Sequence, residues 1–154
     1  MELPRAEAKH LFYMEVTQKE DILVKDTDRG ELLVSPVSGG FFRGEILNGT
    51  VEPAGTGFTW SVPPEKNEIE IKLLLKTLDG GHIFMDSRGT LLIGHDQEEL
   101  LMKGEQVDPA DYYYRFSLSF DTGSSEYRWL NGKCCFAVAG IKDWSTICYD
   151  AYMV

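Results

Sequence analysis

The sequence predicts an all-β fold, a closed antiparallel meander β-barrel of about eight strands with one short helix. Short runs of alternating apolar and polar residues recur along the chain, and Gly, Pro, Asn and Asp separate them. Most of these runs are joined by short turns, which favours antiparallel neighbours, and closing the sheet into a barrel removes its exposed edges. A two-sheet sandwich is the alternative that the same pattern allows.

The first half of the chain supplies four expected strands and a strongly bent segment. The expected strands are Leu11–Val16, Glu31–Val37, Phe58–Val62 and Glu68–Leu78, with turns or loops at 25–30, 55–57 and 63–67. Ser38-Gly39-Gly40 is expected to break the chain, and the glycine-rich Phe41–Val51 is expected to bend, because glycine permits bulges and corners.

The second half begins with a hairpin and contains the one helical candidate. Asp79-Gly80-Gly81 has hairpin-turn chemistry, so His82–Arg88 is expected to return antiparallel to the preceding strand. Gly89 is expected to end that strand, although Leu91–Gly94 is compatible with its extension. Good helix formers predict a helix at Asp96–Gly104. The remaining expected strands are Tyr112–Phe120, Lys133–Ile141 and Ser145–Val154.

Length and charge limit the possible functions. The 154 residues suit a single domain over 1–154, and 43% of them are apolar, enough for a core without disulfide or metal staples. There are 15 basic and 25 acidic residues, giving a net charge of −10. Such a chain repels phosphate backbones and anionic lipid surfaces, so we expect neither a nucleic-acid nor a membrane partner.

Targeting signals and cysteines indicate a cytoplasmic protein. The sequence lacks an apolar run of ~20 residues and an apolar signal segment near its start. Cys134, Cys135 and Cys148 are odd in number and lack the spacing of a disulfide framework. We expect them to be inert packing residues in a reducing compartment.

Five segments, in this order, resemble the domain of unknown function family 3237, also called uncharacterised protein family 0311. The segments are Ser38–Gly44 with Leu47–Val51, Leu75–Gly81 with Ser87-Arg88-Gly89, Tyr113-Tyr114-Arg115 with Phe120–Gly123, Tyr127–Asn131, and Ile147–Val154. The resemblance covers the chain from about Leu11. It implies a closed barrel similar to that of allene oxide cyclase or the lipocalins, and it implies no established function. The sequence departs from the family pattern at Lys72, where arginine is common, and at Thr59, where an acidic residue is common.

The sequence contains no strong catalytic or metal-binding signature. Gly-x-Ser-x-Gly, phosphate-loop, His-Glu-x-x-His and Cys-x-x-Cys motifs are all missing, and the three histidines are scattered. We therefore expect neither a metal nor a cofactor. The candidate ligand-binding residues are instead aromatic and charged side chains: Arg43, Trp60, Glu70, Lys72, Arg88, Tyr113, Arg115, Tyr127 and Trp129.

These candidates lie on mixed strand faces that allow two interpretations. The faces are the solvated outside of a barrel filled by Ile and Leu, or they line a polar pocket while the apolar faces contact another subunit. For Trp129 the alternative to ligand binding is a hydrophobic anchor that closes one end of the barrel. A register error of one residue would exchange the inward and outward sets.

Three functions remain open. The first is binding, inside the barrel, of a small, mostly apolar ligand with an anionic or carbonyl group. The second is a cofactor-free isomerase, cyclase or hydratase with Glu70 as acid or base and Arg88 or Arg115 stabilising an enolate. The third is a homo-oligomeric interaction protein without a ligand. We expect a homo-oligomer under all three.

Overall fold

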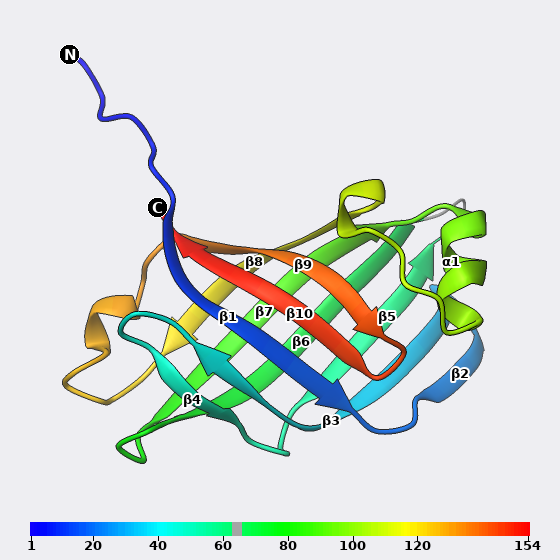
Figure 1. Ribbon diagram of the computed structural model, residues 1–154, viewed down its shortest axis with the longest axis horizontal. Helices are drawn as coiled ribbons and strands as arrows, with labels where there is room; N and C mark the ends of the chain where they lie inside the picture. Colours follow the sequence, from blue (N-terminus) through cyan, green and yellow to red (C-terminus); the bar gives the residue numbers. More distant parts are fainter. Residues whose placement is uncertain (63–65) are drawn as a thin grey trace.

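A computed structural model describes residues 1–62 and 66–154, so part of the loop expected at 63–67 lies outside the described residues. Figure 1 shows strands crossing one another around a central core. The strands are β1 (Lys9–Gln18), β2 (Ile22–Thr27), β3 (Gly30–Arg43), β4 (Asn48–Val51), β5 (Thr56–Val62), β6 (Lys66–Thr77), β7 (His82–Leu92), β8 (Tyr113–Asp121), β9 (Cys135–Asp143) and β10 (Thr146–Met153). The helices are α1 (His95–Met102) and the 3-10 turns η1 (Pro109–Asp111) and η2 (Arg128–Leu130).

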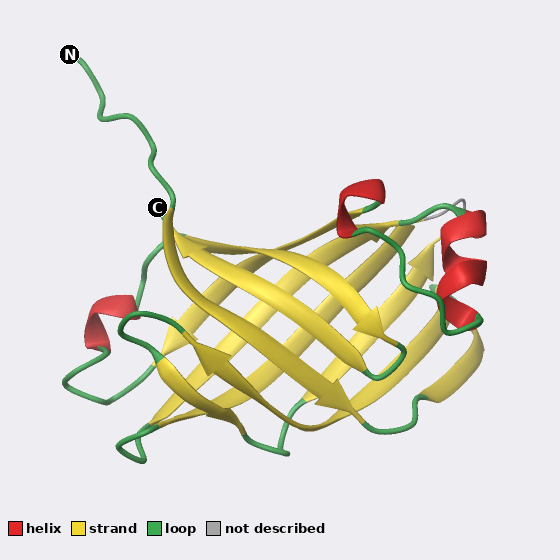
Figure 2. Cartoon of the chain, in the orientation of Figure 1, coloured by secondary structure: helices red, strands yellow, loops and turns green. Residues whose placement is uncertain are grey.

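The sheet closes into an eight-stranded antiparallel barrel, which confirms the predicted fold class. From β6 to β10 each strand pairs with the next, and β10 pairs with β1. The barrel closes because β1 also pairs with β3. β4 and β5 both lie between β3 and β6 and together fill one strand position. Figure 2 shows the helices confined to the two ends of the barrel.

Strict alternation along the strands fills the interior. On β6 the buried apolar residues are Ile69, Ile71, Leu73 and Leu75, while Glu70 and Lys72 between them are exposed. β7 and β8 follow the same rule and bury Ile83, Met85, Phe116, Leu118 and Phe120. The mixed faces of these three strands are therefore the outside of the barrel, which is the first of the two interpretations.

Glycines bend the strands instead of ending them. The chain was expected to break at Ser38-Gly39-Gly40, but β3 runs on to Arg43. Gly39 and Gly40 have φ angles of 148° and 147°, a region that favours glycine, and a Cβ on Gly40 would overlap the carbonyl of Glu15 on β1. The bend lies where the neighbours of β3 change from β2 and β5 to β1 and β4. Gly89 likewise stays within β7, since a side chain there would collide with the ring of Phe116.

Two smaller elements differ from expectation. β2 was not foreseen, and it includes Asp26 with its positive φ. Because β2 runs to Thr27, the turn predicted at 25–30 is confined to Asp28 and Arg29. The short helix is present near one end of the barrel, shifted by one residue at its start, and Leu101 is its buried residue. Among the described residues, none of the helices is long and apolar enough to cross a membrane.

Candidate functional site

A cavity of about 180 Å³ opens at the end of the barrel where α1 lies. Its wall is mostly apolar, with contributions from eight strands (β1, β3 and β5 to β10) and from α1. The apolar residues that line it are Leu33, Ile69, Leu91, Ile93, Leu101, Ile141, Trp144 and Ile147, and its polar lining includes Thr59, Ser61, Asn67 and Tyr114. We call this cavity the barrel mouth.

The barrel mouth exists because the sheet is not fully paired at this end. β10 pairs with β1 as far as the Thr17–Thr146 pair. Beyond that point β2 replaces β1 as the partner of β3. Among the described residues, β2 pairs with no other strand. Trp144, at the tip of the β9–β10 hairpin, lines the opening at this end together with Leu33 of β3. Leu101 of α1 covers part of that opening.

Two tyrosine hydroxyls lie in or beneath the mouth. Tyr114 lines the wall, and burial raises its pKa above the ordinary value of 10.0. On β10, Tyr149 is two residues after Ile147 and therefore lies on the same face, farther from the open end. Its ring centroid is 5.3 Å from that of Phe116. The Tyr149 hydroxyl is fully buried and has no hydrogen-bond partner among the described protein groups. Burial, and then the proximity of Tyr114, raise the pKa of Tyr149 well above its usual range, so it is a neutral hydroxyl.

The charged groups at the mouth are carboxylates. Asp21, Glu98 and Asp143 line its rim, and no lysine or arginine does so among the described residues. Asp21 accepts a hydrogen bond of 2.6 Å from Ser35 Oγ. Hydrogen bonds from the backbone and side chain of Ser145 lower the pKa of Asp143, so this carboxylate stays ionised at neutral pH. The rim therefore repels anions and tolerates neutral or cationic groups.

The candidates predicted on β6 and β7 face solvent, away from the mouth. Lys72 forms an ion pair with Asp86 at 3.1 Å, and Arg88 lies 3.9 Å from a Glu70 oxygen. Glu70 is exposed on the outer face of β6. A carboxylate in that position does not reach a ligand inside the barrel, so the isomerase hypothesis loses the residue it relied on.

Trp60 and Arg43 also lie on the outside. The guanidinium of Arg29 lies 4.2 Å from the ring centroid of Trp60, and that of Arg43 lies 4.9 Å from the ring of Phe41. Both are cation–π contacts at the surface. Neither residue lines the mouth.

Tyr127 and Trp129 lie at the end of the barrel opposite α1. Tyr127 is buried, and Trp129 is half-buried against the core. Trp129 also borders a separate hollow of about 530 Å³, together with His10 of β1 and Ile46 of the β3–β4 loop. These two residues are therefore on the far side of the filled interior from the mouth.

Arg88, Tyr113 and Arg115 are the candidates that the fold does bring together. They line an outer groove of about 510 Å³ across β7, β8 and β9. The guanidinium of Arg115 lies 5.0 Å from the ring of Tyr113. The expected juxtaposition of aromatic and basic residues is thus present on the outside of the barrel.

None of the nine candidate residues predicted from the sequence lines the mouth. In the sequence, the one signal for the residues of the mouth was the apolar alternation of β6. It runs from Leu75 back to Ile69, which lines the mouth. Trp144 and Leu101 carry no such signal, since a hairpin tip and a short helix have no fixed side relative to a barrel. Among the described residues, no group of three or more His, Cys, Asp or Glu side chains is arranged to hold a metal ion.

Comparisons with known proteins agree with this architecture. The profile of the family described as "Protein of unknown function (DUF3237)" matches residues 6–154. A UPF0311 protein of Rhodopseudomonas palustris strain TIE-1 is 32% identical over 130 residues, which are 82% of this chain and 83% of the relative. A UPF0311 protein of Clostridium acetobutylicum is 28% identical over 131 residues, with the same coverage.

Solved structures of similar proteins extend over the whole chain. A conserved protein of unknown function from R. palustris superimposes with a TM-score of 0.87 at 26% identity, covering 99% of both chains. A β-barrel-like protein from Acinetobacter baumannii gives 0.85 at 26% identity, covering 99% of this chain and 98% of that chain. An enzyme from Penicillium herquei gives 0.71 at 18% identity, covering 100% of both, a likeness that shows the fold alone.

Proposed function

The chain belongs to the DUF3237 family, described as of unknown function, and we propose that it binds a small, mostly apolar ligand with a neutral carbonyl or hydroxyl group in the barrel mouth. The observation that carries this proposal is the mouth itself, an apolar cavity that the otherwise filled barrel leaves open at one end. Ligand sites are commonly apolar hollows with a few placed polar groups.

The volume of the mouth suits a ligand part about the size of one ring. An apolar protein cavity of about 150 Å³ holds benzene, and the mouth measures about 180 Å³. Because the cavity opens to solvent beside Trp144, a longer ligand can extend outward past the hairpin tip.

The polar groups favour a neutral oxygen on the ligand. Tyr114 supplies a hydroxyl at the wall, and Tyr149, near Tyr114 but outside the lining, has a buried hydroxyl without a partner among the described residues. Leaving a buried hydroxyl unpaired costs about 1–3 kcal/mol, so a ligand oxygen that reaches it gains from pairing. The anionic group considered from the sequence is disfavoured, because the arginines face outward and Asp21, Glu98 and Asp143 surround the entrance.

Ligand-induced stabilisation tests the proposal, with acetophenone as the probe because it joins one ring to a neutral carbonyl. At a concentration 100 times its dissociation constant a ligand adds about 2.7 kcal/mol, which raises Tm by roughly 5–10 °C for a chain of this size. Leu91→Phe, which adds bulk inside the mouth, should abolish the shift. Leu78→Phe, at an exposed position beyond the far end of β6, should preserve it. An equal shift in both variants would contradict the proposal.

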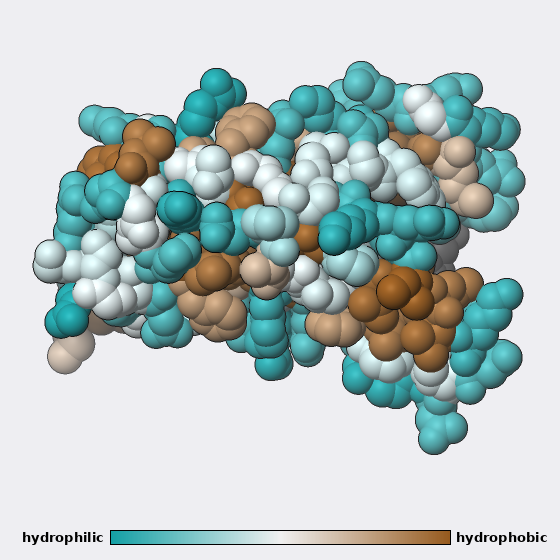
Figure 3. All heavy atoms as spheres, turned by 90° about the horizontal axis from the view of Figure 1, so that it is seen from below, coloured by the Kyte–Doolittle hydropathy of each residue, from teal (hydrophilic) through white to brown (hydrophobic). Residues whose placement is uncertain are grey.

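The expected homo-oligomer is favoured by one observation on β2. Ile22, Leu23 and Val24 are consecutive, apolar and exposed, and among the described residues one edge of β2 has no pairing strand. Figure 3, which views the molecule from below, shows a brown apolar patch at the end where β2 lies. Unpaired apolar edges of this kind are sites of strand addition.

We propose a second copy of the chain as the occupant of that edge. A two-fold antiparallel pairing that sets Leu23 opposite its own counterpart also sets Asp21 opposite Lys25 of the other copy, so charges are matched at both ends of the ladder. Light scattering should then report a dimer for the native chain and a monomer for Leu23→Lys. A monomeric native chain would overturn this pairing without affecting the proposal for the mouth.

A further inference from the structure

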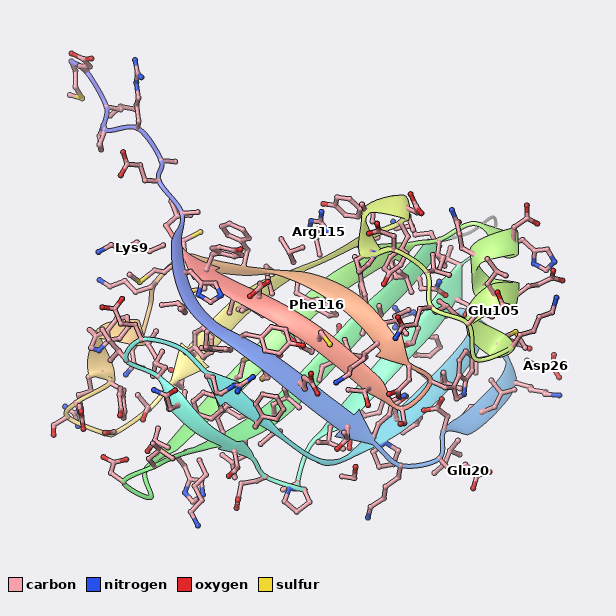
Figure 4. The ribbon with its side chains drawn as sticks, in the orientation of Figure 1. Lys9, Glu20, Asp26, Glu105, Arg115 and Phe116 are labelled. Atoms are coloured by element: carbon pink, nitrogen blue, oxygen red, sulfur yellow. The ribbon has the colours of Figure 1, made fainter. Side chains whose placement is uncertain are left out.

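A groove of about 510 Å³ lies on the outside of the barrel, separate from the mouth. Its outward-facing lining comes from three adjacent strands: Arg88 and Thr90 of β7, Tyr113, Arg115 and Ser117 of β8, and Phe136 of β9. Figure 4 labels Arg115 at the outer surface and the next residue, Phe116, within the barrel. The alternation of β8 thus separates this groove from the core.

Strand register places two arginines diagonally across the groove. Arg88 is opposite Ser117, and Thr90 is opposite Arg115. Diagonal neighbours of this kind are about 7–8 Å apart, so both guanidinium groups can reach one anion between them. Glu70 is on the other side of Arg88, at 3.9 Å, and no carboxylate lines the groove among the described residues. In a chain of net charge −10, this is a local concentration of positive charge.

Aromatic rings hold the groove in shape. Arg115 lies over the ring of Tyr113, and its Nη1 donates a hydrogen bond of 2.9 Å to the carbonyl of Tyr114. This leaves other N–H donors of its guanidinium free to turn toward the groove. On the far side, Phe136 is stacked on Tyr152 with ring centroids 5.3 Å apart and an angle of 17°. A flat ligand would meet an aromatic side chain at both borders.

We infer that this groove binds a small aromatic carboxylic acid. A guanidinium pairs with a carboxylate through two parallel hydrogen bonds, and the aromatic borders favour a planar body attached to it. The volume lies within the 300–1,000 Å³ usual for small-molecule sites. Because Arg88 is exposed and Arg115 is only half-buried, binding is weak and salt-dependent, with a dissociation constant on the order of 1 mM.

Titration with sodium benzoate at low ionic strength, followed by NMR of backbone amides and arginine side-chain N–H groups, tests the inference. We expect saturable shifts at Arg88, Arg115 and Ser117. Benzamide, which has the same shape without the charge, should bind at least ~10-fold more weakly. Arg115→Gln should weaken benzoate binding by a similar factor.

A matched variant separates this site from diffuse charge attraction. Lys76→Gln removes the same charge from the outer face of β6, at the opposite end of the barrel, and should change benzoate affinity less than twofold. Equal losses in Lys76→Gln and Arg115→Gln would overturn the inference, as would benzoate shifts confined to Ile69 and Tyr114 in the mouth. The mouth is tested by the neutral probe acetophenone, so failure of one site is distinguishable from failure of the other.

Discussion

Removing the buried hydroxyl of Tyr149 is expected to stabilise the protein. The Tyr149→Phe substitution keeps the ring that packs on Phe116, so it creates no new cavity. It removes an oxygen with no hydrogen-bond partner among the described protein groups, and the desolvation of such a group costs about 1–3 kcal/mol. At about 2–4 °C per kcal/mol for a chain of this length, Tm should rise by several degrees.

Tyr112 provides the matched control of opposite sign. It is also a buried tyrosine on the β8 side of the barrel, but its hydroxyl accepts a hydrogen bond of 2.7 Å from the backbone N–H of Ile141. Tyr112→Phe leaves that N–H without its acceptor and should lower the free energy of unfolding by about 1–3 kcal/mol.

Urea unfolding of both variants in ligand-free buffer measures the two effects directly. If Tyr149→Phe loses as much stability as Tyr112→Phe, the hydroxyl of Tyr149 has a partner in solution, and the reasoning that assigns it a free hydrogen bond for a ligand is refuted. A gain in Tyr149→Phe accompanied by weaker acetophenone binding would support that reasoning.

Three further predictions concern backbone geometry, pH and thiol reactivity. Gly40→Ala should destabilise the protein severely, because its Cβ would overlap the carbonyl of Glu15, whereas Gly123→Ala, with nothing within 4 Å, should change the free energy of unfolding by less than about 1 kcal/mol in thermal melts. The hydrogen bond from Lys142 holds the pKa of Glu15 below its ordinary value of 4.5. The ion pair of Glu15 with Lys142 should add about 0.5–1 kcal/mol to the free energy of unfolding above pH 4.5, and this contribution should be lost as the pH falls through the folded-state pKa of Glu15. In urea titrations the stability deficit of Glu15→Gln should therefore shrink toward pH 3 and not grow. A thiol reagent should modify the exposed Cys134 first; rapid reaction of Cys135, whose pKa is raised by burial, would contradict its placement.

The fold was predictable because the alternation of apolar and polar residues distinguishes the two faces of each strand. The alternation from Ile69 to Leu75 identifies one buried face without reference to any other strand. The Asp79-Gly80-Gly81 turn then fixes the pairing of β6 with β7. Glycine was harder to interpret, because a glycine can end a strand or lie within one. Gly40 allows β3 to bend beside Glu15, and Gly89 leaves room for the ring of Phe116.

The barrel mouth was less predictable because it depends on contacts between distant segments. Leu33, Leu101 and Trp144 meet only after the barrel closes and α1 docks near its end. The candidates selected by residue type, such as Glu70 and Arg115, are charged, and alternation places charged residues outside. The sequence thus identified the mixed faces of β6, β7 and β8 but left open whether they point inward, and the cavity formed on the apolar side.

A crystal soaked with 4-bromoacetophenone tests the central claim most directly, because bromine gives an anomalous peak at the position of the ligand ring. We predict one strong peak among Leu91, Ile93 and Tyr114 in native crystals, and its loss in Leu91→Phe. A peak only in the outer groove, or no ordered bromine at a concentration that stabilises the protein, would contradict the assignment of the barrel mouth as the ligand site.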